Sequence, residues 1–299
     1  MATSKLPIYS ALAANLFIAV IKFIAAGVTG SSAMISEGIH SLVDTINEIL
    51  LLVGIRQSQK PADEKRPFGY GKELYFWAFV VSVLIFGVGG GISFYEGVTH
   101  LLNPHALEDP LWNYVVLAFA LFFDGVSFVI AMREFNRQRG DTPFWKAVKK
   151  SKDPTTFVVL FEDAADVLGL GVAFLGVFLG HYFNNSYFDA VASILIGLIL
   201  AAISIVLARE SRSLLMGETL SQTTLDKIIA ISSTPAVIRV QTPLSMYLSP
   251  EEVILVLLIT FKRELNPHDL QGAIESIKED LLREFPVIKR IYIEPQSLS

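Results

Sequence analysis

Long apolar runs, interrupted by short polar segments, fill the first two thirds of the chain. A helix needs about 20 mostly apolar residues to cross a bilayer. The first run has no small-residue cleavage site and is too long for a signal peptide, so we expect a retained span. The pattern predicts an all-α membrane domain, residues 1–209, with six transmembrane helices, at 8–28, 33–55, 74–100, 112–132, 155–182 and 187–208.

The loops between these runs carry their basic residues on one side. Twelve lie in the loops after the second and fourth runs, whereas the other three loops contain no Lys or Arg. Basic loops stay in the cytoplasm, so both termini are predicted to be cytoplasmic. The twelve are Arg56, Lys60, Lys65, Arg66, Lys72, Arg133, Arg137, Arg139, Lys146, Lys149, Lys150 and Lys152.

Residues 210–299 have a different pattern, with shorter apolar runs. The run "VILVLLITF" at 253–261 is too short to span and is typical of a buried strand. Asn266 followed by Pro267 is a favourable helix start, so we expect a helix over 267–285. A helix near 222–232, a strand near 237–247 and the final strand "IKRIYIE" complete the order α-β-β-α-β. This order predicts a small α+β ferredoxin-like cytoplasmic domain with an antiparallel or mixed sheet.

Composition supports a membrane protein. The chain is 52% hydrophobic and 18% charged, against about 25% charged in soluble domains. It contains no cysteine, which excludes disulfides and thiolate metal sites. A net charge of −5 gives no support for nucleic-acid binding.

Two apolar runs contain titratable pairs at helical spacing. His40 and Asp44 lie four apart in the second run, and Glu162 and Asp166 lie four apart in the fifth. Such groups cost about 2.5–3.5 kcal/mol each at the centre of a membrane helix, so they need a reason. Because the two helices run in opposite directions, Asp44 and Asp166 each lie about 16 Å from the end at which their helix begins, near the midplane. With His40 above this level and Glu162 below it, the four side chains are expected to converge on one point. One imidazole and three carboxylates suit a divalent first-row metal.

Further polar residues accompany these runs. Glu48 follows Asp44 by one turn, and Asp163 neighbours Glu162. Both, with Asp124 in the fourth run, are candidates to support the ligands or line an ion path, although bonding between helices explains them as well. Lys22 needs an acidic partner, such as Glu48.

The chain resembles the cation diffusion facilitators, a family of divalent-metal/proton antiporters that are usually homodimers. The resemblance rests on "AANLFIAVIKFIAAGVTGSSAMISEGIHSLVDTINE", "PFGYGK" and "LLMGE" and covers essentially the whole chain. The branch related to mitochondrial zinc transporter nine looks most similar. The family's transport site has ligands spaced by four in spans two and five, which implies His40, Asp44, Glu162 and Asp166 here.

Three departures from the family pattern qualify the resemblance. Typical zinc members carry His where this chain has Glu162. The carboxylate of Glu162 is a harder ligand than imidazole and makes the site more anionic. Some bacterial members bind a second metal after span two, but Arg66 and Tyr70 stand where its histidines would lie beside Asp63, so we expect no such site. His268 is the single histidine of the cytoplasmic domain, which is therefore expected to dimerise rather than to bind metal.

The expected function is export of a divalent transition metal from the cytoplasm in exchange for protons, with no prosthetic group and no enzymatic activity. Zn²⁺ is the expected substrate, with Mn²⁺, Fe²⁺ and Co²⁺ as competitors, and the plasma or inner membrane is the expected location. The alternatives are an intramembrane metal-dependent hydrolase and a passive cation channel. The basic stretch 133–152 is explained by topology, with attraction to anionic lipid as a secondary role.

Overall fold

The structure, a computed structural model, describes residues 6–103 and 110–296. It divides into two compact units, residues 1–56 with 76–211 and residues 57–75 with 212–299. The loop that follows the second apolar run thus belongs with the C-terminal residues, which the sequence did not indicate. We describe each unit separately.

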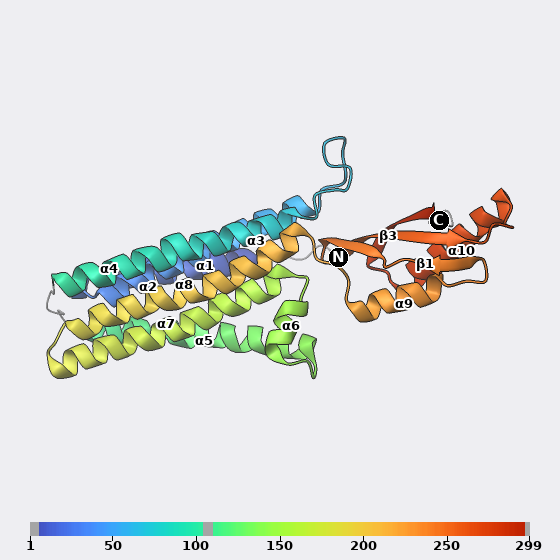
Figure 1. The fold of residues 1–299 in the computed structure, drawn as a ribbon. Helices are drawn as coiled ribbons and strands as arrows, with labels where there is room; N and C mark the ends of the chain where they lie inside the picture. The colour runs from blue at the N-terminus through green and yellow to red at the C-terminus, as the bar shows by residue number, and fades with distance from the viewer. Residues whose placement is uncertain (1–5, 104–109, 297–299) are drawn as a thin grey trace. The chain divides into compact units, whose positions relative to one another are not determined.

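The first unit is a bundle of long helices (Figure 1). The helices are α1 (Leu6–Thr29), α2 (Ser32–Ser58), α3 (Glu73–Leu84), the π-helix η1 (Ile85–Gly90), α4 (Gly91–Leu102), α5 (Pro110–Arg139), α6 (Phe144–Lys150), α7 (Pro154–Phe183) and α8 (Tyr187–Met216). The long helices match the six apolar runs in position, and the short helix α6 lies outside them.

Within the described residues, four helical stretches are long and apolar enough to cross a membrane: Ser32–Ser58, Glu73–Leu102, Leu111–Arg139 and Tyr187–Met216. The second of these is α3, η1 and α4 in continuous succession. The chain is therefore a membrane protein with a mostly helical first unit. The short helix α6 was not predicted, because seven residues are too few to show a helical period.

Small residues let the helices approach closely. A Cβ added at Gly97 of α4 would lie 2.6 Å from the backbone nitrogen of Ile194 in α8. One added at Gly90 would lie 3.1 Å from the carbonyl oxygen of Gly197. The packing of α4 on α8 thus depends on glycine, as is common between membrane helices.

Helix α2 begins at a carboxylate supplied by another helix. Asp189 of α8 is fully buried, and its side chain accepts hydrogen bonds from the Ser31 hydroxyl (2.5 Å) and from the backbone N–H of Ser32 (2.6 Å) and Ala33 (3.3 Å). These N–H groups have no partner inside their own helix. The contact therefore satisfies the N-terminus of α2, complements its dipole and ties α2 to α8.

The second unit has α9 (Gln222–Ser232) and α10 (Pro267–Glu284) packed on a mixed sheet. Strand β3 (Glu252–Phe261) lies at its centre, antiparallel to β1 (Val237–Val240) and β2 (Leu244–Ser249) and parallel to β4 (Ile288–Gln296). The hydrophobic core of this unit is formed by both helices and by alternate residues of β3. Its members include Leu225, Ile228, Val253, Leu255, Leu257, Ile259, Ile277 and Leu281.

The strand expected near 237–247 is two strands, β1 and β2, that pair with different parts of β3. The break contains Pro243, which has no N–H to donate to the ladder. The mixed sheet and the element order otherwise follow the sequence prediction. Asn266 is the N-cap of α10 and accepts from the Asp269 N–H, with Pro267 at the first helical position.

Candidate metal centre

Two side chains of the candidate centre come from the middle of α2. His40 is 1% exposed and Asp44 8% exposed, and their spacing places them one helical turn apart on the same face. The His40 Nδ1 lies 3.5 Å from the Asp44 Oδ1. Both groups therefore face the interior of the bundle.

The third side chain comes from α7, whose start is well specified. Asp153 caps this helix by accepting from the Thr155 N–H at 3.0 Å, and Pro154 occupies the first position. Three turns on, the Asp166 Oδ1 lies 3.0 Å from the His40 Nε2. One imidazole thus stands between two carboxylates from antiparallel helices.

These three residues can share one ion. One ligand atom from each of His40, Asp44 and Asp166 lies within 4.8 Å of the others. The ligands of a tetrahedral Zn²⁺, at bonds of about 2.0–2.2 Å, lie about 3.4 Å apart. Small side-chain movements would bring the group to this geometry.

Three polar atoms of the group are buried without a hydrogen-bond partner in the part of the chain that the structure describes. Among the described residues, neither ring nitrogen of His40 nor the Asp44 Oδ1 is aligned for a hydrogen bond. Buried polar atoms normally have partners. A cation held between these atoms would supply what the protein does not.

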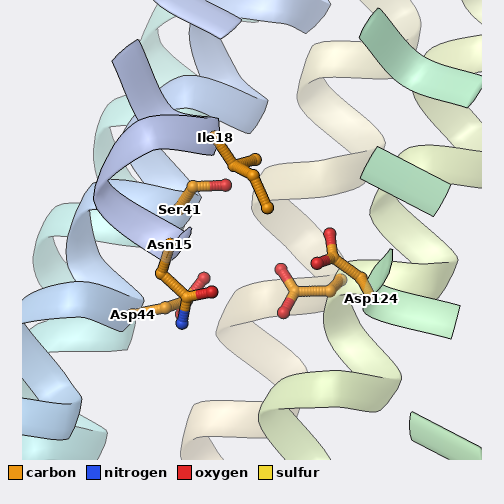
Figure 2. Close-up of a pocket in the computed structure, with 6 residues that line it drawn as sticks. Asn15, Ile18, Ser41, Asp44 and Asp124 are labelled. Carbon is orange, nitrogen blue, oxygen red and sulfur yellow. The ribbon is translucent and has the colours of Figure 1, made fainter. Parts of the chain in front are cut away.

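A small cavity adjoins the group. Its volume of about 20 Å³ has room for one water molecule or one bare ion. Figure 2 shows Asp44 and Asp124 on opposite sides of it, from α2 and α5. The lining comprises Asn15, Ile18, Ser41, Asp44, Asp124 and Asp166.

The fourth expected ligand lies apart from this group. The Glu162 Oε1 accepts a hydrogen bond from the Asn47 Nδ2 at 2.8 Å, and Glu162 is buried. Because α2 and α7 are antiparallel, residues nearer the end of α2 lie level with residues nearer the start of α7. On ideal helices the Cα atoms of His40 and Glu162 would therefore be offset by about 12 Å along the axes, on opposite sides of the Asp44–Asp166 level.

The remaining acidic candidates divide between the cavity and other contacts. Asp124 lines the cavity. Asp163 accepts from the Ser127 hydroxyl at 3.0 Å, and the Glu48 Oε1 accepts from the Asn15 Nδ2 at 2.9 Å. Asp163 therefore bonds a neighbouring helix instead of facing the cavity.

Lys22 has a different partner from the one suggested by the sequence. Its Nζ lies 3.1 Å from the Glu37 Oε2 and donates to the Ser41 hydroxyl at 2.7 Å. Lys22 and Glu37 are both fully buried. The pair thus lies beside the cavity, which Ser41 lines.

Two cavity residues, Asn15 and Ser41, were not identified as part of the site from the sequence. Asn15 precedes Lys22 by seven residues, so both lie on one face of α1, and Ser41 directly follows His40. That spacing was the available signal for Asn15. Nothing in the sequence distinguishes Ser41 from the other serines of α2.

A scan against family models matches residues 8–216 to the cation efflux transmembrane domain. The chain belongs to the cation efflux family. This confirms the resemblance to the cation diffusion facilitators. The members of this family are transporters, not enzymes.

Curated relatives agree with this assignment. The mouse proton-coupled zinc antiporter SLC30A9, mitochondrial, is 37% identical over 201 residues, which are 67% of this chain and 35% of the mouse protein. Metal tolerance protein C4 of Arabidopsis thaliana is 27% identical over 266 residues, 88% of this chain and 57% of its own length. Magnetosome protein MamM of Paramagnetospirillum magneticum is 28% identical over 178 residues, 60% of this chain and 52% of its own.

The chain spans about a third of the length of SLC30A9 and just over half of the other two relatives. The 37% identity with SLC30A9 confirms the suspected branch of the family.

In the loop after α2, Asp63 is held by its neighbours. It accepts from the Tyr70 hydroxyl at 2.6 Å and from the Lys65 and Arg66 N–H groups. The hydrogen bond from Tyr70 lowers the pKa of the Asp63 carboxyl. The absence of a second metal site here stays a prediction.

His268 is exposed on the first turn of α10. No other His, Cys, Asp or Glu group able to hold a metal was found in the parts of the chain that the structure describes. That the second unit dimerises rather than binds metal stays a prediction.

Proposed function

We propose that this chain is a secondary active transporter that exports a divalent transition metal, with Zn²⁺ as the principal substrate, in exchange for protons. The observation that carries the proposal is the group of His40, Asp44 and Asp166 in the middle of two antiparallel helices, beside a polar cavity. The names of the SLC30A9 relatives, proton-coupled zinc antiporters, support the substrate.

The chemistry of the three ligands favours proton exchange. A metal binds neutral imidazole and ionised carboxylates, so its binding releases protons. Two ionised aspartates carry −2, which a divalent cation neutralises. When the cation leaves, protons on the same groups keep the empty centre tolerable in lipid.

We propose Glu162 as a further ligand, reached when α7 moves relative to α2. At present the Glu162 Oε1 accepts a hydrogen bond from Asn47, which competes with an ion for this oxygen. Alternating access around a midplane site is the expected mode of transport. Asp124, which lies across the cavity from Asp44 (Figure 2), is proposed to line the ion path. Glu48, one turn after Asp44 in α2, is proposed to line it as well.

For the architecture, we propose that α1 and α7 also span the membrane, which gives six spans with both termini in the cytoplasm. The second unit is proposed to be a ferredoxin-like domain that joins two copies into a homodimer. We expect the plasma or inner membrane, and fractionation would test this against a mitochondrial location like that named for SLC30A9.

The test is transport by the purified protein in proteoliposomes, with a metal-sensitive dye and a pH-sensitive dye inside. Zn²⁺ and Mn²⁺ are presented in turn to wild type, Asp166→Ala and a control, Glu96→Gln. Glu96 is a carboxylate of α4 that does not line the cavity. We expect metal uptake with opposite proton movement in wild type and control, and loss of both in Asp166→Ala.

Two outcomes would overturn the proposal. Metal flux without proton movement, at rates above carrier turnover, would favour the passive channel. No flux for either metal, with Asp166→Ala indistinguishable from wild type, would return the buried aspartates to a structural role.

A further inference from the structure

The basic segment between α5 and α7 contains a pocket that, within the described residues, shares no lining residue with the cavity at the candidate metal centre. The pocket lies between the end of α5 and helix α6 and has a volume of about 280 Å³. Its polar lining is Gln138, Arg139, Thr142, Lys150 and Ser151, with Phe135 and Ala147 as its apolar part.

The charge of this region is strongly positive. Residues 133–152 contain seven Lys or Arg and two acids, whereas the whole chain has a net charge of −5. The two acids are Glu134 and Asp141, neither of which lines the pocket. Glu134 accepts hydrogen bonds from Arg137 and from Gln138. No acidic side chain is among the described residues that line the pocket.

The two cations at the pocket are differently arranged. Arg139 donates through Nε to the Asn136 Oδ1 at 2.6 Å and through Nη1 to the Thr142 carbonyl at 2.8 Å, which fixes the guanidinium. Lys150 is exposed and makes no ion pair among the described residues. Together they supply one oriented and one free positive charge.

The pocket lies at the depth of lipid headgroups. Helix α5 is a candidate span whose first charged residue near this end is Arg133. Phe135 and Arg139 follow at roughly 3 Å and 9 Å further along the axis. Headgroup layers are roughly 5–8 Å thick on each side of the hydrocarbon.

Helix α6 has the character of a segment at the membrane surface. Val148 is buried, whereas Trp145 is 57% exposed and contacts the Phe144 and Phe161 rings. The lysines of the helix are exposed. Exposed tryptophan beside lysine is typical of the membrane–water interface.

We propose that this pocket binds the phosphate of an anionic phospholipid headgroup. Arg139 and Lys150 neutralise the phosphate, the hydroxyl and amide groups hydrogen-bond its oxygens, and the exposed ring of Trp145 lies among the acyl chains of neighbouring lipid. The bound lipid joins the end of α5 to α6, immediately before α7.

The experiment compares two lysines of the same helix turn. Delipidated full-length protein in neutral detergent is titrated with phosphatidylglycerol, and bound lipid is counted by native mass spectrometry. Lys149 and Lys150 are both exposed in the last turn of α6, so helix dipole and topology act on them alike. Of the two, Lys150 lines the pocket.

We expect Lys150→Gln to weaken phosphatidylglycerol binding about tenfold, because the variant loses a charged hydrogen bond to the phosphate worth about 1.5 kcal/mol. Lys149→Gln should leave binding within the error of the wild type. Equal weakening by both variants would show diffuse surface attraction and overturn the pocket.

A second arm separates lipid from soluble anion. Inorganic phosphate is added to the lipid-loaded protein, and phosphatidylcholine replaces phosphatidylglycerol in a parallel titration. The proposal expects neither phosphate displacement nor tight phosphatidylcholine binding. Displacement by inorganic phosphate would assign the pocket to a soluble anion, and equal affinity for phosphatidylcholine would refute recognition of the negative headgroup.

Discussion

Replacement of Lys22 by methionine tests the electrostatics beside the cavity. Lys22 and Glu37 are both fully buried, with 3.1 Å between Nζ and Oε2, and the Glu37 Oε1 has no hydrogen-bond partner among the described residues. Removing the ammonium leaves a buried carboxylate without its ion-pair partner. The loss of one partner of a buried pair costs about 3–5 kcal/mol.

The second variant, Lys22→Met with Glu37→Met, removes both charges and keeps the volume approximately constant. Replacing a buried pair with apolar side chains is often neutral or stabilising. We therefore expect the double variant to regain most of the free energy of unfolding that the single variant loses. Ser41→Ala serves as a control for the hydrogen bond from Lys22 alone, with an expected cost of about 0.5–1.5 kcal/mol.

The assay is reversible unfolding in mixed micelles at increasing mole fraction of dodecyl sulfate, followed by tryptophan fluorescence. A double-mutant cycle gives the interaction free energy between the two positions. The cycle also needs the single variant Glu37→Met. If Lys22→Met and Glu37→Met each lower the free energy of unfolding by less than about 1 kcal/mol and their effects add, the two residues do not form the buried ion pair that the structure describes.

Three further predictions concern packing and the loop. Asp189→Ala should cost about 2–4 kcal/mol in the same unfolding assay, because several buried donors at the start of α2 lose their acceptor. A change below about 0.5 kcal/mol, which is the usual scatter of surface substitutions, would contradict this expectation. Gly176→Ala should destabilise the bundle by about 1–3 kcal/mol, since its Cβ would overlap the Cβ of a residue in α8, whereas Gly171→Ala on the same helix meets nothing and should not. Tyr70→Phe should raise the pKa of Asp63 toward its ordinary value, measured by carboxyl NMR titration. The contact with Tyr70 stabilises the folded loop when Asp63 is ionised. Because the pKa of Asp63 is lower in the folded state than in the unfolded state, this stabilisation is fully present above the ordinary pKa. It is lost as pH falls through the folded pKa.

The helices were predictable because membrane thickness fixes their length. The expected run 33–55 lies inside Ser32–Ser58, and 155–182 lies inside Pro154–Phe183. Short elements have no such constraint. Helix α6 and the division of the strand near 237–247 were therefore missed, although Pro243 was a signal for the division.

At the candidate centre, the sequence determined depth better than it determined contacts. Opposite helix directions placed Asp44 and Asp166 at one level, and the structure brings both to His40. The same arithmetic, taken one step further, separates His40 from Glu162 by about eight residues of rise, or about 12 Å. In this structure three of the four side chains lie together, whereas Glu162 lies apart from them and accepts a hydrogen bond from Asn47. We therefore expect Glu162, one turn of α7 before Asp166, to bind the ion as it enters or leaves the centre formed by the other three side chains.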